Sequence, residues 1–241
     1  VRGPRKLIDR YRKKILKSRP LRVLDLERYL LLIDDLPGVT AKSVLTPSKD
    51  KPSATTMTLI LADKAFEGHV GADNRGSKFN GPYEFSGGLT ANSLLGDHTR
   101  TGLQGVITSQ TEELLFLNAF YDFPINQEGT RLFFSGSVSE SEPGSSLKQF
   151  NIKGDSSTMT LRLTHPFFRS RGKNLTGHLG FTGRNSTTKI LGSLDSEDRL
   201  RVATMGVSYD FADKNKGVNL IRLNLSQGLN IFDATESGSS N

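Results

Sequence analysis

Two different spacings of apolar residues divide the chain. In residues 1–64 the apolar positions recur first at helical spacing and then in two short runs, whereas from residue 65 onward they alternate with polar positions. A period of 3.6 indicates a helix with one buried face, and a period of two indicates a strand with two different faces. The sequence therefore predicts an α+β domain over 1–64 and an all-β region over 65–241.

The first helix is predicted over residues 4–16. Pro4 suits a first helical turn, and the apolar residues recur three or four positions apart. The expected buried face consists of Leu7, Ile8, Tyr11 and Ile15.

A second helix is predicted in "LDLERYLLLIDDLPGV", residues 24–39. Asp25 is expected to cap its start, and Pro37-Gly38 to end it. The expected buried stripe is Leu26, Tyr29, Leu30 and Ile33.

Two strands are predicted next, "VTAKSVL" over 39–45 and "ATTMTLIL" over 54–61, with the turn-rich "TPSKDKPS" between them. A sheet of two strands is only marginally stable. We therefore expect one more strand of this domain to precede Val1.

From residue 65 onward, nine segments alternate apolar and polar side chains. In "LIRLNLSQGLNI", for example, Leu223 and Leu225 share one face while Arg222 and Asn224 share the other. A soluble β-sandwich also alternates, but here the polar face carries Arg, His, Asn and Gln, and aromatics gather at strand ends in "YDFP", "HPFF", "SYDF" and "NIF". Strands of about ten residues with these features are typical of a transmembrane β-barrel, which we predict to be antiparallel.

Connection lengths suggest an orientation for this barrel. The longest polar breaks, over 139–157 and 184–198, are expected to be extracellular loops, whereas "DKNKG" over 213–217 is a short turn of the periplasmic type. Because nine is an odd number and bacterial barrels have even strand numbers, we expect the chain to end inside the barrel.

Composition excludes several classes of protein. No apolar run reaches the roughly 18 residues that a transmembrane helix requires. The chain has no Cys, and its four His residues show no ligand spacing, so neither a metal nor another cofactor is predicted. No nucleophile motif or carboxylate pair stands out, so we predict neither an enzyme nor a small-molecule substrate.

Positive charge is concentrated at the start of the chain. Residues 1–24 contain ten Lys or Arg and the single acid Asp9, whereas the whole chain has a net charge of +7. This segment could contact anionic lipid headgroups or an acidic partner, or form an ordinary solvated helix face. Nucleic acid is not an expected partner, because no aromatic platform or recognised binding motif accompanies the charge.

Four segments in order resemble the two-partner secretion transporters, which export haemolysins and filamentous adhesins across the outer membrane of Gram-negative bacteria. "RPLRVLDLERYLLLIDDLPGVTAKSVLTPS" resembles the second helix and following strand of that family's membrane-proximal POTRA (polypeptide-transport-associated) domain. "DNRGSKFNGPYEFSGGLTANSLLGD" resembles its first barrel hairpin, and "LTHPFFRSRGKNL" and "LSQGLNIF" resemble later strands. The resemblance implies a POTRA domain over 1–64 and about nine strands of a barrel of about 16 strands.

The resemblance also implies a function and a location. The POTRA domain lies in the periplasm, and an unfolded, repeat-rich secreted partner adds a strand to its exposed sheet edge before passing through the barrel. The alternative, that this strand is an ordinary structural strand, stays open. Proline at Val44 is expected to remove an edge donor. The candidate edge consists of Val39, Thr40, Ala41, Lys42, Ser43, Val44 and Leu45.

Luminal polar residues complete the candidate site. They are expected to wet the pore and to hold a plug, and the simpler alternative for each is a solvated wall position without a specific role. The other functions considered are an outer-membrane-protein insertase with the same POTRA-plus-barrel architecture, and a passive porin, which would lack the helices. The candidate pore-lining residues are Arg100, Gln104, Arg162, His178 and Arg222.

Overall fold

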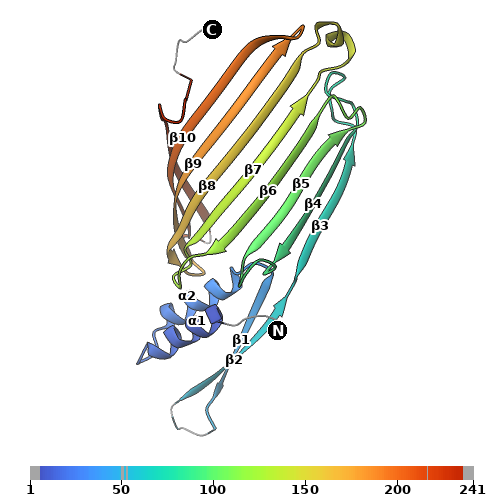
Figure 1. Cartoon of the computed structure of the whole chain (residues 1–241). Coiled ribbons are helices and arrows are strands. Elements are labelled where there is room, and N and C mark those ends of the chain that lie inside the picture. Colours follow the sequence, from blue (N-terminus) through green and yellow to red (C-terminus); the bar gives the residue numbers. More distant parts are fainter. Residues whose placement is uncertain (1–5, 50–51, 53, 216, 236–241) are drawn as a thin grey trace.

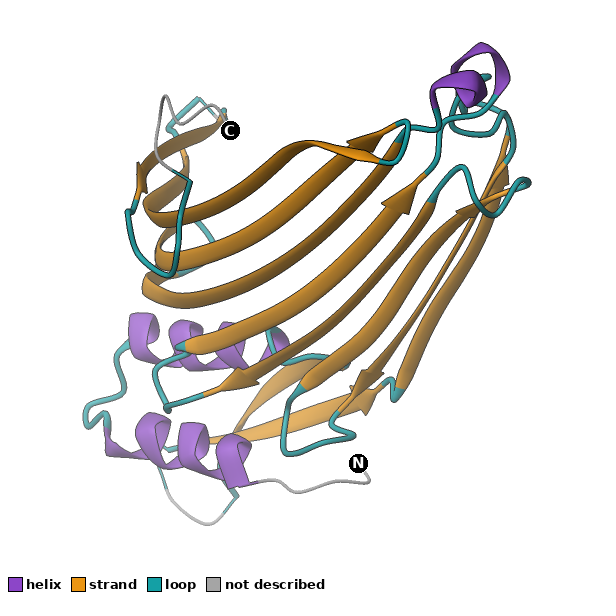
Figure 2. Ribbon diagram, turned by 45° about the horizontal axis from the view of Figure 1, so that its top comes forward, coloured by secondary structure: helices purple, strands orange, loops and turns teal. Residues whose placement is uncertain are grey.

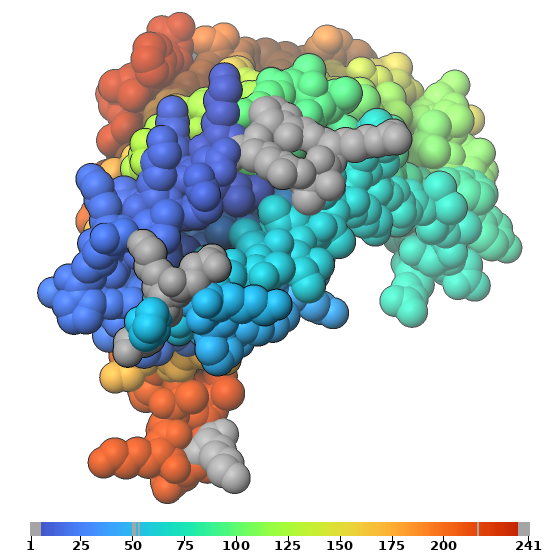
Figure 3. Space-filling view, turned by 90° about the horizontal axis from the view of Figure 1, so that it is seen from below, coloured from blue at the N-terminus to red at the C-terminus, as the bar shows by residue number. Residues whose placement is uncertain are grey.

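The structure is a large, tilted and curved β-sheet with two helices and a β-hairpin at one end (Figure 1). It is a computed structural model that describes residues 6–49, 52, 54–215 and 217–235. Figure 2 shows the curvature of the sheet, and Figure 3, seen from the helical end, shows the helices lying over part of its rim.

The first helix, α1 (Lys6–Lys17), buries the face that the sequence predicts. Leu7, Ile8, Tyr11 and Ile15 are all buried, and Tyr11 is only 1% exposed. Residues 4 and 5, where the helix was expected to begin, lie outside the described residues. The predicted buried stripe is therefore confirmed. It could be predicted because helical geometry alone places these four side chains on one face.

The second helix, α2 (Val23–Asp34), turns a slightly different face inward than predicted. Leu32 and Ile33 are buried and Tyr29 packs against them, whereas Leu26 and Leu30 are only half-buried. The expected Asp25 cap is also wrong. Arg22 occupies the N-cap position and makes no side-chain capping hydrogen bond, so Asp25 lies inside the first turn. There its negative charge interacts favourably with the helix dipole, and its carboxylate accepts a 2.8 Å hydrogen bond from Ser18 Oγ.

A two-stranded hairpin closes this small core. Strands β1 (Val39–Pro47) and β2 (Thr55–Asp63) pair antiparallel along their whole length. Their residues Val39, Ala41, Leu59 and Leu61 pack against the apolar faces of the helices. The predicted order of two helices and two strands is therefore confirmed.

The second sheet contains nine strands that follow one another in sequence order, each antiparallel to the next. This agrees with the nine alternating segments of the sequence. The strands are β3 (Phe66–Asp73), β4 (Glu84–Asn92), β5 (Arg100–Thr108), β6 (Leu115–Pro124), β7 (Arg131–Ser141), β8 (Lys153–Arg169), β9 (Lys173–Ile190), β10 (Ser193–Ala212) and β11 (Val218–Gly228).

Three of these strands are much longer than the expected ten residues. Strands β8, β9 and β10 contain 17, 18 and 20 residues. The predicted loop over 184–198 is therefore wrong, because most of it pairs in the β9–β10 hairpin. These polar residues form a two-stranded ribbon that continues beyond the apolar part of the two strands. Leu191 and Gly192 make its turn, with φ values of 52° and 81°. The predicted break after β7 is a real connection over 142–152 that contains a 3-10 helix, η1 (Ser145–Phe150).

The two faces of the sheet differ in chemistry. Residues paired across antiparallel strands point to the same face, and the register places the large aliphatic side chains together. They remain exposed in this sheet, which makes one face a continuous apolar surface. It includes Leu89, Leu103, Leu117, Val138, Met159, Leu161, Leu179, Met205, Val207, Ile221, Leu223 and Leu225.

The opposite face is polar but not uniformly so. Phe120 and Phe133 lie on it with their rings stacked at 6.1 Å between centroids. Glycine gives such rings room: a Cβ atom at Gly102 would collide with the ring of Phe120, and one at Gly206 with that of His178. These glycines thus leave space on the polar face for large side chains from the neighbouring strands.

Aromatic side chains form a belt at the helical end of the apolar face. Strands β6, β8 and β10 all end there, and each ends in one of the predicted aromatic clusters. The rings of Tyr121 and Phe123 stack at 5.2 Å, and those of Tyr209 and Phe211 at 5.0 Å. Neither helix in the described part of the chain combines the length and hydrophobicity needed to span a bilayer.

Candidate functional site

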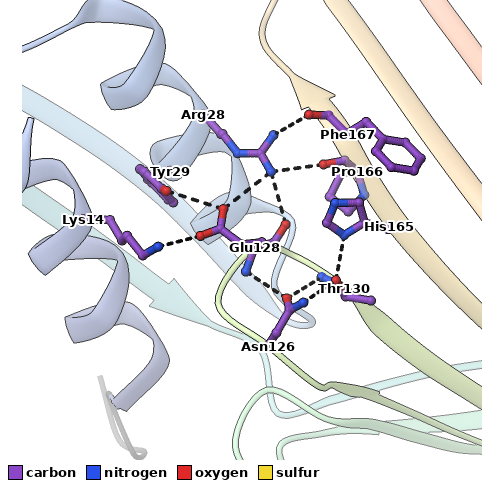
Figure 4. Close-up of polar contacts among 9 residues, drawn as sticks. All are labelled: Lys14, Arg28, Tyr29, Asn126, Glu128, Thr130, His165, Pro166 and Phe167. Carbon is purple, nitrogen blue, oxygen red and sulfur yellow. Dashed lines mark hydrogen bonds and ion pairs between the residues drawn. The ribbon is translucent and has the colours of Figure 1, made fainter.

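The helices join the sheet through a group of polar contacts that we call the junction (Figure 4). It brings together side chains of α1 and α2, the β6–β7 turn over 125–130 and the end of β8. Its members are Lys14, Arg28, Tyr29, Asn126, Glu128, Thr130, His165, Pro166 and Phe167.

Glu128 is the central acceptor of the junction. Its carboxylate lies 2.7 Å from Lys14 Nζ and 3.7 Å from Arg28 Nη2, and it accepts a long, 3.5 Å hydrogen bond from the Tyr29 hydroxyl. One carboxylate from the turn thus holds both helices. Because about a third of its side chain is exposed, each ion pair alone contributes little, and the network is the effective unit.

Arg28, whose side chain is 20% exposed, also contacts the sheet. The β8–β9 ladder is interrupted between Pro166 and Phe168, a β-bulge that leaves Phe167 as an extra residue. The Arg28 guanidinium donates to the carbonyl oxygens of Pro166 and Phe167, both at 3.1 Å. The planar fork of donors therefore satisfies two carbonyl groups at the irregularity.

The β6–β7 turn is itself stabilised from within. Asn126 Oδ1 accepts hydrogen bonds from the backbone N–H groups of Glu128 and Thr130, at 2.8 and 3.1 Å. Thr130 Oγ1 lies 2.7 Å from His165 Nδ1 on β8. These bonds fix the direction of the Glu128 side chain toward the helices.

Proton affinities at the junction follow from these contacts. The hydrogen bond to Glu128 raises the pKa of Lys14. Burial raises the pKa of Tyr29, with Glu128 adding to the effect, and burial also raises the pKa of Tyr11 to about 12. Near neutral pH, Lys14 is therefore charged and both phenols are neutral, which is the state that the contacts require.

A second clamp lies beside the junction. Arg169 at the end of β8 makes two 2.7 Å contacts with the carboxylate of Asp35 just after α2, a bidentate pair. Arg169 also donates to Asn174 Oδ1 at 2.9 Å, and Asn174 donates to Asp210 at 2.7 Å. The end of α2 is thus connected to three adjacent strands.

The predicted partner-binding strand is an unpaired edge within the described part of the chain. β1 pairs only with β2 in a two-stranded sheet. The Ala41 N–H donates to Asp34 Oδ1 at 2.8 Å and so points away from β2. In an antiparallel pair, N–H directions alternate along a strand, so Ser43 and Leu45 also face the open edge, whereas Val44 faces β2 opposite Thr58. Proline at Val44 would therefore break the hairpin instead of removing an edge donor, which corrects the sequence-based expectation.

The five predicted pore-lining residues share the polar face. Arg100 and Arg162 belong to one cross-strand row through Asp122 and Phe133. Gln104 on β5, His178 on β9 and Arg222 on β11 each lie an even number of positions from the point where this row crosses their strand, so they point to the same face. The Arg100 guanidinium lies over the Phe120 ring at 5.5 Å.

The junction itself was not among the candidates from the sequence. Arg28 and Phe167 are 139 residues apart, and no local pattern marks a polar residue for a distant partner. The one available signal was the run of turn residues "PINQEG" between two strands, which predicts a turn but not its role. Among the described residues, no group of three or more His, Asp or Glu could hold a metal ion.

Comparison with known proteins gives a consistent result. The family model of the haemolysin secretion/activation protein ShlB/FhaC/HecB matches residues 61–240. Heme/hemopexin transporter protein HuxB of Haemophilus influenzae is 28% identical over 167 residues, which cover 68% of this chain and 29% of HuxB. The chain thus spans less than a third of that relative.

Solved structures share the fold. CdiB from Escherichia coli matches 96% of this chain and 45% of its own with a TM-score of 0.79 and 21% identity. CdiB from Acinetobacter baumannii matches 86% of this chain and 41% of its own, with a TM-score of 0.56 and 13% identity. BamA from Haemophilus ducreyi lacking POTRA domains 1–3 matches 92% of this chain and 46% of its own, with a TM-score of 0.51 and 11% identity.

Proposed function

Since the chain belongs to the haemolysin secretion/activation protein family of outer-membrane β-barrel transporters, which are not enzymes, we propose that it is part of a protein that exports a secreted partner polypeptide. The family match over residues 61–240 carries this proposal. The relatives are longer than this chain, so the proposal concerns the full-length protein.

The two faces of the sheet support a transmembrane barrel. A continuous apolar surface fits the lipid side, and a face bearing Arg100, Arg162 and Arg222 fits a wet lumen. On β10, the apolar positions from Ala203 to Phe211 extend about 26 Å along the strand at roughly 3.3 Å per residue, and the tilt of roughly 40° that is typical of such strands reduces this to about 20 Å of height, comparable to the apolar band of outer-membrane barrels. We therefore assign the five polar residues to the pore wall of the barrel. The total of about 16 strands is what membership of the family implies for the full-length protein.

The helices and the hairpin fit a POTRA domain on the periplasmic side, covering residues 1–64. The open edge of β1 supplies outward N–H groups at Ser43 and Leu45, to which an extended partner can pair. Backbone pairing does not depend on side chains, which suits an unfolded client. The junction then fixes this edge relative to the end of the barrel.

An outer-membrane-protein insertase is the second candidate. The BamA match supports it at the level of fold. The higher TM-score of CdiB, 0.79 against 0.51, and the family match both favour the transporter.

Deletion of the full-length gene tests the two functions. A transporter is required for one exoprotein, which should disappear from the medium and return when the gene is supplied, while the levels of other outer-membrane proteins stay constant. Normal export of every secreted protein in the deletion strain contradicts the proposal. A general fall in outer-membrane proteins identifies an insertase instead.

A further inference from the structure

Exposed apolar side chains lie at the start of α2 and at the end of β8, and we call them together the shelf. Its residues are Leu21, Val23 and Leu24 on the helical side and Phe167 and Phe168 on the sheet. Their exposures are 49%, 74%, 71%, 55% and 63%. Contiguous apolar side chains this accessible are typical of a surface that binds something.

Local structure explains why the shelf faces outward. The buried stripe of α2 begins at Tyr29, so the first turn, with Val23 and Leu24, extends beyond the helical core. On the sheet, the bulge adds Phe167 between residues that keep the ladder, so two successive rings lie on the apolar side. Phe167 packs over Gly177, where a Cβ atom would lie 2.7 Å from its ring.

A groove of about 1130 Å³ runs between the two parts of the shelf. Leu24 and Arg28 line it on the helical side, and Phe168, Leu175 and Tyr209 on the sheet. The last three form one cross-strand row of the apolar face. The groove is therefore the end of the surface that faces lipid, and the turn between α1 and α2 projects beyond the sheet there (Figures 1 and 2).

Basic side chains lie on both segments that border the groove. Lys173, at the start of β9, lines the groove itself, and Arg171, 86% exposed in its side chain, precedes it on the β8–β9 connection. On the helical side, Lys17 at the end of α1 and Arg19 and Arg22 on the connection to α2 are exposed next to Val23 and Leu24 in the sequence. The acids at the groove are already engaged: Asp25 accepts from Ser18, and Glu128 binds Lys14. Glu27 accepts from the Arg171 backbone N–H at 2.9 Å and lies 3.9 Å from the Arg171 guanidinium. An apolar groove rimmed by cations is complementary to a lipid with an anionic headgroup.

We propose that the shelf binds anionic phospholipid of the periplasmic leaflet, with an acyl chain in the groove and the headgroup at Arg19, Arg22 and Lys173. The inference rests on the proposed membrane placement of the barrel. It gives the basic start of the chain a specific role, which is to hold the helices against the membrane beside the junction.

Lipid contact can be measured by fluorescence quenching. Full-length protein carrying a fluorophore on Val23→Cys is reconstituted in phosphatidylethanolamine vesicles containing brominated lipid, with or without phosphatidylglycerol. Lys13→Cys is the matched control, because it is exposed on the opposite side of α1 from the buried Tyr11. Quenching at position 23 should be several-fold stronger than at position 13 and should increase with phosphatidylglycerol.

Charge removal tests the headgroup contact. Arg19→Gln and Arg22→Gln should each lower, about fivefold, the ratio of lipid-contacting to lipid-free fluorophore at position 23 in vesicles that contain phosphatidylglycerol. Equal quenching at positions 13 and 23 overturns the proposal. Quenching at position 23 that is the same with and without the two arginine substitutions also overturns it. A photo-crosslinker at Val23 that captures the exported polypeptide or a second copy of the protein instead of lipid also overturns it.

Export reports separately on the two proposals. Normal partner export without quenching at position 23 refutes lipid binding only. Strong, charge-dependent quenching in a protein that exports no partner refutes the proposed function only.

Discussion

At the scale of single residues, Arg28 shows why charge alone does not describe a contact. Its guanidinium reaches two carbonyl groups at the bulge and approaches Glu128 as well. A lysine ammonium has the same charge but cannot present a planar fork of donors. The geometry of the side chain, and not its charge, matches the irregular end of β8.

We predict that Arg28→Lys in the full-length protein will increase the rate of amide exchange in α2 about tenfold, because hydrogen bonds of charged groups contribute about 1.5–3 kcal/mol and part is retained. The Arg28 side chain is only 20% exposed, so solvent screening is limited. Hydrogen exchange with mass spectrometry measures the rate. Arg12→Lys is the control, because the Arg12 side chain is 63% exposed and its one ion pair, with Asp9, is long at 3.7 Å. Unchanged exchange in Arg28→Lys would show that the junction does not hold α2.

At the scale of elements, β1 combines an inner pairing and an open edge in one strand. The same nine residues that pair with β2 present alternate N–H groups outward. A substitution therefore acts on the partner or on the hairpin according to whether its position is odd or even.

We predict that Ser43→Pro will reduce partner export several-fold while the protein reaches the outer membrane at a normal level. Proline is tolerated on an edge strand where the missing N–H would face solvent. Val44→Pro is the contrasting variant, because it removes a donor to β2 and should unfold the hairpin. Immunoblots of medium and membrane fractions measure both. Full export by Ser43→Pro would exclude this edge as the partner site.

The α1 core is expected to weaken in alkali. Burial raises the pKa of Tyr11 from 10.0 to about 12, so the neutral phenol is favoured in the folded state. This contribution to stability is complete below pH 10 and decreases as the pH rises toward 12, by up to about 3 kcal/mol. Denaturant titrations with a probe in α1 measure the loss.

Tyr11→Phe separates this effect from other groups. The variant should lose the part of the decrease that is due to the phenol, while Lys14, whose pKa is also raised, still contributes above pH 10.5. Identical pH profiles for the two proteins would mean that the phenol does not control the stability of this core.

At the scale of the whole molecule, the difference between the two faces of the sheet determines how the protein meets its surroundings. Leu223 and Asn224 are neighbours on β11 but point to opposite faces. Leu223 is 68% exposed near the middle of the apolar positions of that strand. If that face contacts lipid, the two positions tolerate charge very differently.

We predict that Leu223→Arg will destabilise the full-length barrel by about 2–4 kcal/mol, whereas Asn224→Arg will cost little because Arg222 already occupies the same face. Folding titrations in lipid vesicles measure both variants. Equal costs, or the reverse order, would show that the lipid and pore faces are assigned wrongly.

The sequence by itself determined those features that follow from local periodicity. The buried face of α1, the nine alternating segments, and the polar side of each strand that carries Arg100, Gln104, Arg162, His178 or Arg222 depend only on the spacing of side chains along single elements. Only the tertiary structure decided the lengths of β8, β9 and β10, because polar residues pair in a ribbon as readily as they form a loop. It alone also decided the junction, because contacts such as that of Arg28 with Phe167 join residues 139 positions apart and their energy depends on where the chain returns, which no local pattern records.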